Sequence, residues 1–181
     1  MALSTQDFRI TFMALPDQII VRPAREEDVG AIVAFSAAMA METEGRQLDM
    51  ARLREGTLAL LKTPDRGFFM VAALPQDPSQ HILGQLMITF EWSDWRNAAF
   101  WWIQSVYVAP AWRRQGVYRQ MHHSIMLLAR SRSDVCGVRL YVEENNAAAR
   151  HVYSRVGLSI SSYQVYETDF VLPRARDRNG R

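Results

Sequence analysis

The sequence predicts an α/β protein in which helices cover a central mixed β-sheet. Three observations support this fold class. Segments with strand character alternate with segments of helical spacing along most of the 181 residues. Residues 100–108 are almost wholly apolar, as expected for a central strand covered on both faces. Apolar side chains then recur every three or four residues between positions 116 and 132, which is typical of a helix buried along one side.

The first half of the chain is expected to hold two helices between short strands. Residues 19–22 are predicted to form a strand, and the helix after it has acidic residues in its first turn. The polar segment 41–49 is expected to be a loop, and a second helix follows it until Pro64. Apolar runs at 68–74 and 82–90, separated by turn residues, predict a β-hairpin whose second strand places Ile82, Leu86, Ile88 and Phe90 on one face.

The second half is expected to continue with a helix, a strand, a helix and a last strand. The strand covers residues 138–142. Asn146 opens the next helix, and Gly157 suits the left-handed position that ends it. A last β segment is predicted at residues 159–170.

Composition and charge indicate one globular domain over residues 18–170, with an N-terminal extension at 1–17 and a basic tail at 171–181. The formal charge is +2, but the segment from position 174 carries four Arg and one Asp, which leaves −1 for the rest. No element gathers Lys and Arg, so a nucleic-acid partner is not expected. No run could span a bilayer and no secretion signal is present, so we expect a cytoplasmic protein without a membrane partner.

The cysteine and histidine content predicts neither a disulfide nor a metal site. Cys136 is the single cysteine, and no Cys/His group has the spacing of metal ligands. His122 and His123 are interpreted as surface or core histidines. A reducing compartment agrees with this composition.

The most specific pattern is VYVAPAWRRQGVY, in which a buried strand passes through a short basic turn into a helix. Gly116 permits close approach of the backbone, and Arg113 and Arg114 supply positive charge. The amino end of the helix adds free N–H groups, so the turn suits a diphosphate. The alternative is an ordinary strand-to-helix connection with two exposed arginines. The spacing fits neither a Walker A loop nor the GxGxxG fingerprint.

This segment resembles the acetyl-CoA motif of Gcn5-related N-acetyltransferases (GNAT), where a strand ending in V-x-P leads to [Q/R]-x-x-G-x-[G/A] and a helix. Arg113, Gly116 and Tyr118 occupy the three defining positions. Tyr118 departs from the small residue usual at the third position, although a GNAT subgroup with G-V-[FY]-R is closer to this chain.

A second segment, LYVEENNAAARHVYSRVGL, resembles the later GNAT motif N-x-x-A-x-x-x-Y-x-x-x-G-[FL]. Asn146, Ala149, Tyr153, Gly157 and Leu158 match it in register. Two motifs in the right order are far less frequent by chance than either one alone. The chain is therefore identified as a GNAT member over residues 19–167.

The resemblance implies a GNAT fold, with a central, mostly antiparallel mixed sheet whose fourth and fifth strands splay apart. Acetyl-CoA would be the cosubstrate and no metal would be needed. The pantetheine arm would lie in the splay and the pyrophosphate at the turn. The residues implied to bind the cofactor are Val106, Tyr107, Val108, Arg113, Arg114, Gln115, Gly116, Val117, Tyr118 and Asn146.

The resemblance also implies that Tyr153 is the general acid, whose phenol would protonate the departing thiolate. The alternative role is a tyrosine that packs in the core. Many GNAT members carry a Glu on the fourth strand as the base, whereas this strand offers Gln104 and Ser105. Glu91 is the next candidate, acting directly or through water, and Glu42 and Glu44 are further candidates. Each of these carboxylates could instead be solvated or paired with a cation.

The acceptor side is expected to form where the segment METEGRQLD and the turn EWSDWRN face each other across a cleft. Glu42, Glu44 and Glu91 would make its mouth negative beside Trp95, which favours a cationic amine. Gln104 would also contact the substrate. Trp101 and Trp102 alternate along one strand, so only one of them should face the cleft.

Two alternatives to an N-acetyltransferase stay open. One is a degenerate GNAT module that binds acyl-CoA in a sensing or partner role, and the other is a structural α/β interaction protein. The amine acceptor is either a small molecule or a protein. The oligomeric state is open, with a homodimer as one option.

Overall fold

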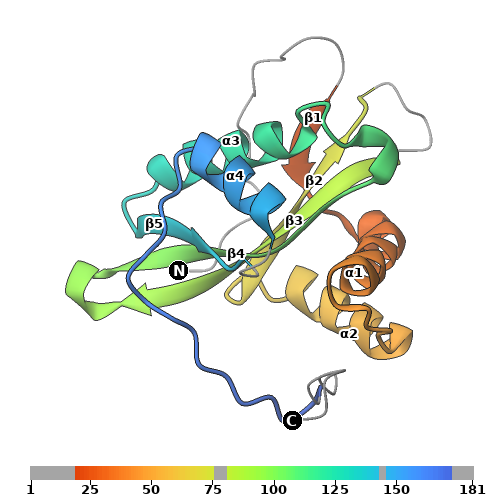
Figure 1. The fold of residues 1–181 in the computed structure, drawn as a ribbon, viewed down its shortest axis with the longest axis horizontal. Helices are drawn as coiled ribbons and strands as arrows, with labels where there is room; N and C mark the ends of the chain where they lie inside the picture. Colours follow the sequence, from red (N-terminus) through yellow and green to blue (C-terminus); the bar gives the residue numbers. More distant parts are fainter. Residues whose placement is uncertain (1–18, 76–80, 143–145, 173–181) are drawn as a thin grey trace. The chain divides into compact units, whose positions relative to one another are not determined.

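The computed structural model describes residues 19–75, 81–142 and 146–172 (Figure 1). The expected N-terminal extension 1–17 lies outside these residues, as does the basic tail 171–181 apart from its first two positions. The chain divides into two compact units, residues 1–143 and residues 144–181.

The first unit is built on a five-stranded sheet with the strand order β1-β2-β3-β4-β5. Neighbouring strands are antiparallel from β1 to β4, whereas β5 runs parallel to β4. The predicted mixed, mostly antiparallel sheet is thus confirmed. The strands are β1 (Ile20–Pro23), β2 (Gly67–Ala73), β3 (Ile82–Ser93), β4 (Ala98–Val108) and β5 (Val135–Leu140).

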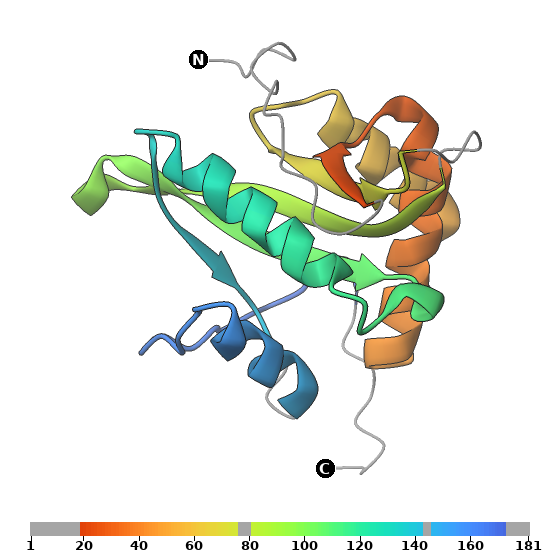
Figure 2. The same ribbon diagram turned by 90° about the horizontal axis from the view of Figure 1, so that it is seen from above.

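Helices cover both faces of this sheet. α1 (Val29–Glu44) and α2 (Met50–Leu61) lie on one face, and α3 (Val117–Arg130) crosses the other (Figure 2). Each helix turns its apolar side chains toward the strands, which is how two layers share one core.

The polar segment at residues 41–49 was expected to be a loop, and this is wrong for its first part. α1 continues through Glu44 and ends at Gly45, which has a left-handed backbone with φ 62°. Glycine favours that conformation because it has no Cβ. Asp49 then caps α2, its carboxylate accepting hydrogen bonds from the N–H groups of Ala51 and Arg52 at 2.9 and 3.1 Å.

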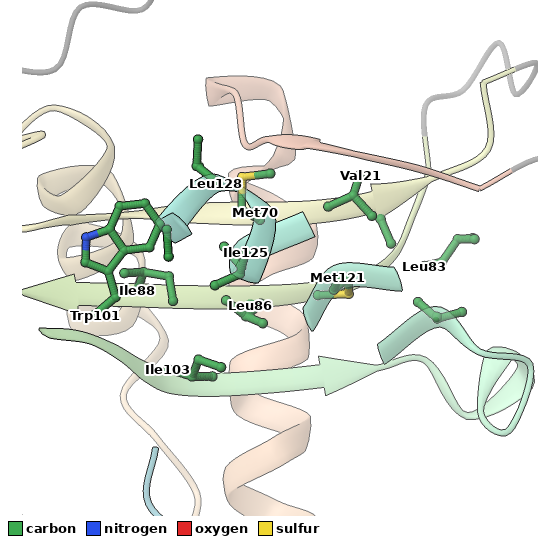
Figure 3. Packing of buried hydrophobic residues seen from close by; sticks show 13 residues of the cluster. Val21, Met70, Leu83, Leu86, Ile88, Trp101, Ile103, Met121, Ile125 and Leu128 are labelled. Carbon is green, nitrogen blue, oxygen red and sulfur yellow. The ribbon is translucent and has the colours of Figure 1, made fainter. Parts of the chain in front are cut away.

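The largest core cluster lies between the sheet and α3. Leu86, Ile88 and Trp101 from the strands pack against Met121 and Ile125 from α3 (Figure 3). Trp101 is only 3% exposed, so the expected core role for one of the two adjacent tryptophans is confirmed. The alternation along β4 directs Trp102 to the opposite face.

A second cluster lies under α1 and α2 and includes Ile32, Leu60 and Val71. Ile82 also belongs to this cluster, although it was expected on the same face as Leu86. The register of β2 and β3 shifts at Ala72 and Ala73. One residue of shift moves a side chain to the other face, which explains the difference.

The strands β4 and β5 part half way along β4. The residues of β4 from Ala99 to Ile103 pair with β5, but β5 ends at Leu140 while β4 runs on to Val108. Residues 105–108 keep their partners on the β3 side. No strand in the described part of the chain pairs with their other edge, which gives the splay implied by the resemblance.

The second unit contains α4 (Ala147–Arg155). Asn146 caps the helix, accepting a hydrogen bond from Ala149 N at 3.0 Å. Gly157 ends it with a left-handed φ of 90°, as predicted. The strand expected at residues 159–170 does not form. A strand needs a partner to satisfy its backbone, and the described residues of this unit contain none.

His122 is a buried histidine on α3 and is only 4% exposed. Within the described residues, its Nε2 has no hydrogen-bond partner. Burial lowers the pKa of this imidazole, helped by the charges of His123 and Arg130. The folded protein therefore keeps His122 neutral at a pH where an unfolded chain would protonate it.

This burial predicts that stability falls as the pH drops below about 6.5, the ordinary histidine pKa. The unfolded chain binds a proton there that the folded chain does not, so acid favours unfolding by up to about 1.4 kcal/mol per pH unit. Replacing His122 with Leu should flatten the dependence of Tm on pH between 7 and 5. His151→Leu, at an exposed position on α4, should keep the parental slope; equal slopes in all three proteins would contradict the prediction.

Candidate functional site

A basic turn joins the end of β4 to the start of α3. Two of its residues have left-handed backbones, Arg114 with φ 62° and Gly116 with φ 85°. Such a conformation is uncommon for an arginine and is often kept where function needs it. Gly116 is the residue before α3, and no side chain of the described residues caps the helix there.

The amino end of α3 therefore keeps backbone N–H groups for an anion. The helix is 14 residues long, and its N-terminus carries the positive end of the helix dipole. Arg119 in its first turn brings a guanidinium nitrogen within 3.6 Å of the position that a Cβ of Gly116 would take. Arg119 was not among the residues predicted from the sequence to bind the cofactor. It is the arginine of the segment G-V-Y-R, which could have indicated it.

The backbone expected to bind pantetheine lies directly before this turn. Val106, Tyr107 and Val108 form the end of β4, beyond the point where β5 stops. On the β3 side they pair with residues 84–86. A Cβ at Gly84 would lie 2.8 Å from the carbonyl oxygen of Tyr107, so glycine permits this close pairing. The structure thus brings the expected pantetheine and diphosphate residues of the first unit together.

Glu42, in the last turn of α1, reaches the same end of β4. Its Oε1 accepts a hydrogen bond from the Tyr107 hydroxyl at 2.6 Å, and its Oε2 accepts one from Arg113 Nη2 at 2.7 Å. The Tyr107 bond, followed by the Arg113 bond, lowers the pKa of Glu42. Burial and the bond to Glu42 raise the pKa of Tyr107. Glu42 is therefore a carboxylate and Tyr107 a neutral phenol at neutral pH.

Glu44 does not join this group. It lies two residues further along α1, and residues two apart on a helix point in different directions. Its carboxylate pairs instead with Arg46, with 3.5 Å between Oε2 and Nε.

Glu91 belongs to β3 and lies beside the other end of β4. It faces Phe100 in the β3–β4 register, six residues before Val106. At about 3.4 Å per residue, that separation is roughly 20 Å along the strand. Its carboxylate accepts hydrogen bonds from Trp102 Nε1 and from Arg139 Nη1, the latter at 2.7 Å. The expected meeting of Glu91 with Glu42 across one cleft is therefore wrong.

Trp95 belongs to the same distant hairpin and is 84% exposed. Gln104 lies where the splay begins, and its Nε2 donates a hydrogen bond to the Thr89 hydroxyl at 2.7 Å. Two residues earlier on β4, the ring of Trp102 stacks on that of Tyr141, with centroids 4.3 Å apart. Sequence reasoning could not select Tyr141, because only strand pairing brings it beside Trp102.

Tyr153, the expected general acid, lies in α4 of the second unit. Burial raises the pKa of its phenol, so the hydroxyl keeps its proton at neutral pH. Asn146, expected to bind the cofactor, uses its side-chain oxygen to cap α4. The roles of both residues remain predictions.

Two features are absent from the described residues. No group of three or more His, Cys, Asp and Glu side chains in that part of the chain could hold a metal ion. No helix there combines the length and the apolar character needed to cross a membrane.

Comparison with solved structures identifies proteins with a similar fold. A possible acetyltransferase from Clostridium difficile 630 is 36% identical, with a TM-score of 0.78 over 86% of this chain and 100% of that one. An acetyltransferase from Trypanosoma brucei is 18% identical, with a TM-score of 0.63 over 83% of this chain and 99% of that one. An aminoglycoside N-acetyltransferase in complex with CoA is 11% identical, with a TM-score of 0.66 over 88% and 100%.

Comparison with protein-family models identifies the family of this chain. A search of curated protein sequences found no significant match. The sequence model of the acetyltransferase (GNAT) family, however, matches residues 22–158. This range includes both motifs, the splayed strands and the basic turn. The chain is therefore a member of the GNAT acetyltransferase family.

Proposed function

We propose that this protein is an N-acetyltransferase that transfers the acetyl group of acetyl-CoA directly to an amine. One observation carries the proposal. The edge of β4 that β5 leaves unpaired leads directly into a basic turn at the uncapped amino end of α3. An extended amide chain that ends in a diphosphate fits these two features in that order, and pantetheine with its diphosphate is such a chain.

The residues of this chain have separate tasks in the proposed reaction. Backbone groups at Val106, Tyr107 and Val108 hold the pantetheine arm by strand-like hydrogen bonds. Arg113, Arg114 and the first N–H groups of α3 hold the diphosphate. Bound acetyl-CoA supplies an activated acyl group as a thioester.

The proposed transfer needs an acid for the leaving sulfur more than it needs a side-chain base. The neutral amine attacks the thioester carbonyl carbon, the carbon–sulfur bond breaks, and Tyr153 donates its proton to the sulfur. Glu91, on β3 beside the far end of β4, lies too far away to act as the base, and the two hydrogen bonds to Glu42 lower its pKa and make it a weak base. We propose that the amine enters in its neutral form. After the carbon–nitrogen bond forms, the nitrogen loses one proton to water, and solvent returns a proton to Tyr153.

The first test is whether CoA stabilises the folded protein. A ligand that binds only the folded state adds about 2.7 kcal/mol at 100 times its Kd. For a chain of this size, that corresponds to a rise in Tm of about 5 to 10 °C. Replacing Arg113 and Arg114 with Ala should reduce the rise at the same CoA concentration. A parental Tm that does not move in saturating CoA would contradict cofactor binding.

A second measurement separates the enzyme from a degenerate acyl-CoA-binding module, the alternative that Tyr118 and the absent strand glutamate favour. The protein is incubated with acetyl-CoA and a panel of small-molecule and peptide amines, and the release of free thiol is followed. An enzyme releases thiol only when a suitable amine is present. A Tm shift without release for any amine would support the binding module.

A further inference from the structure

A network of three side chains joins the last turn of α1 to the end of β4. Glu42 accepts hydrogen bonds from Tyr107 and Arg113 through separate carboxylate oxygens. Arg113 Nε also donates to the carbonyl oxygen of Val108 at 3.0 Å, and its guanidinium carbon lies 5.1 Å from the centre of the Tyr107 ring. Phe35 of α1 supports the ring of Tyr107 from its own side, with centroids 5.2 Å apart.

Ligands in solution can reach this network. The side chains of Glu42 and Arg113 are 44% and 42% exposed. An exposed ion pair contributes little stability, because water solvates both charges well when they separate. The contact between Glu42 and Arg113 can therefore open at low cost, whereas the bond between Glu42 and Tyr107 is shielded by the buried ring of Tyr107.

The network conflicts with the diphosphate role of Arg113. Its Nη2 points to Glu42 and its Nε to Val108, so two of its five donors are occupied. A diphosphate at the amino end of α3 would carry negative charge toward the carboxylate of Glu42. Two anions cannot share one guanidinium without repelling each other. Cofactor binding must therefore weaken the pair between Glu42 and Arg113.

We infer that Glu42 is a positioning residue that holds Arg113 until the diphosphate of the cofactor replaces Glu42 as the partner of Arg113. This inference rests on the proposed function. Once Arg113 turns to the diphosphate, Glu42 stays in place on Tyr107 with its charge no longer neutralised. A negative site then exists beside the splay only when the cofactor is bound. An acceptor that carries a second, cationic group besides the reacting amine would bind Glu42 through that group after acetyl-CoA and not before it.

The inference has a definite sign in a binding experiment. Replacing Glu42 with Gln removes the competing charge, so Arg113 is available to the diphosphate at the start. The Kd of CoA, measured by titration calorimetry, should fall about two- to fivefold, the range expected for loss of one exposed ion pair. The Kd of pantetheine, which has no diphosphate, should not change. A residue that merely supported the fold would weaken both ligands or neither.

Two further variants separate displacement from simple loss of negative charge. Glu55→Gln removes the same charge from an exposed position on α2 and should leave the Kd of CoA at the parental value. Tyr107→Phe keeps every charge but removes the hydroxyl that holds Glu42, so it should also tighten CoA binding, by less than Glu42→Gln.

Each other outcome overturns part of the argument. If Glu42→Gln binds CoA as the parent does or more weakly, Glu42 does not compete for Arg113 and the inference is wrong. If Tyr107→Phe leaves the affinity unchanged while Glu42→Gln raises it, general electrostatics explain the effect and the inference is also wrong. If the parent itself binds no CoA, the proposed function fails, and the inference fails with it.

Discussion

Replacing Tyr153 with phenylalanine is expected to lower turnover about a hundredfold or more while leaving the affinity for CoA nearly unchanged. General acid catalysis contributes a factor of this size, because a thiolate leaves more readily as it receives a proton. The phenol is needed in the transition state rather than in the bound complex, so kcat falls and binding does not. The raised pKa of Tyr153 keeps that proton on the oxygen at neutral pH. Release of free thiol under saturating acetyl-CoA and amine measures kcat.

A tyrosine outside the motif provides the matched control. Tyr163 lies 10 residues further along, outside any helix or strand, and the same change there should leave kcat at the parental value. Calorimetry on both variants measures the Kd of CoA. If Tyr153→Phe keeps the parental kcat when chemistry limits the rate, Tyr153 packs in the fold and another group protonates the sulfur.

Replacing Gly67 with alanine is expected to be among the most destabilising single changes in the chain. Gly67 begins β2 with a φ of 150°, a conformation that L-residues rarely adopt. A Cβ there would lie 2.0 Å from the carbonyl oxygen of Ile88 on β3. The backbone of a central strand cannot move aside cheaply, so we expect a loss of about 3 kcal/mol or more in the free energy of unfolding. Urea denaturation followed by circular dichroism measures this loss.

Gly56→Ala is the control, because the same atom is added where there is space for it. Gly56 lies inside α2, and a Cβ there would meet no described heavy atom within 4 Å. Alanine is the better helix former, so this variant should gain about 0.4 to 1 kcal/mol. If Gly67→Ala unfolds at the parental urea concentration, strands β2 and β3 are further apart at this point than the structure places them.

Most helices and strands of this chain can be predicted from local sequence patterns. The apolar run of β4 and the helical spacing of α3 are patterns of residues close together in the chain. The left-handed glycine after α4 is likewise a local feature of a helix end. The turn between β4 and α3 is local as well, which is why Arg113 and Gly116 could be selected for the diphosphate. The pattern missed Arg119, which lies only one turn further on.

Patterns failed where a partner decides the structure. The segment at residues 159–170 has strand character, yet no described strand of its own unit pairs with it. Ile82 has the spacing of Leu86, but a register shift against β2 turns it to the other face. The polar segment at residues 41–49 has the composition of a loop, although its first four residues complete α1 before Gly45. In each case a backbone ladder or a helix end overrode the local preference.

The sequence by itself determined the family of this protein, since both motifs are continuous segments whose chemistry depends on neighbouring residues. Only the tertiary structure decided which carboxylate reaches the proposed cofactor site. Glu42 is 65 residues from Tyr107 and 71 residues from Arg113, yet it contacts both. Glu91 is much nearer in sequence and lies at the far end of the strand. Spacing along a chain predicts contacts within a helix or turn, whereas contacts between α1 and β4 depend on how the layers pack.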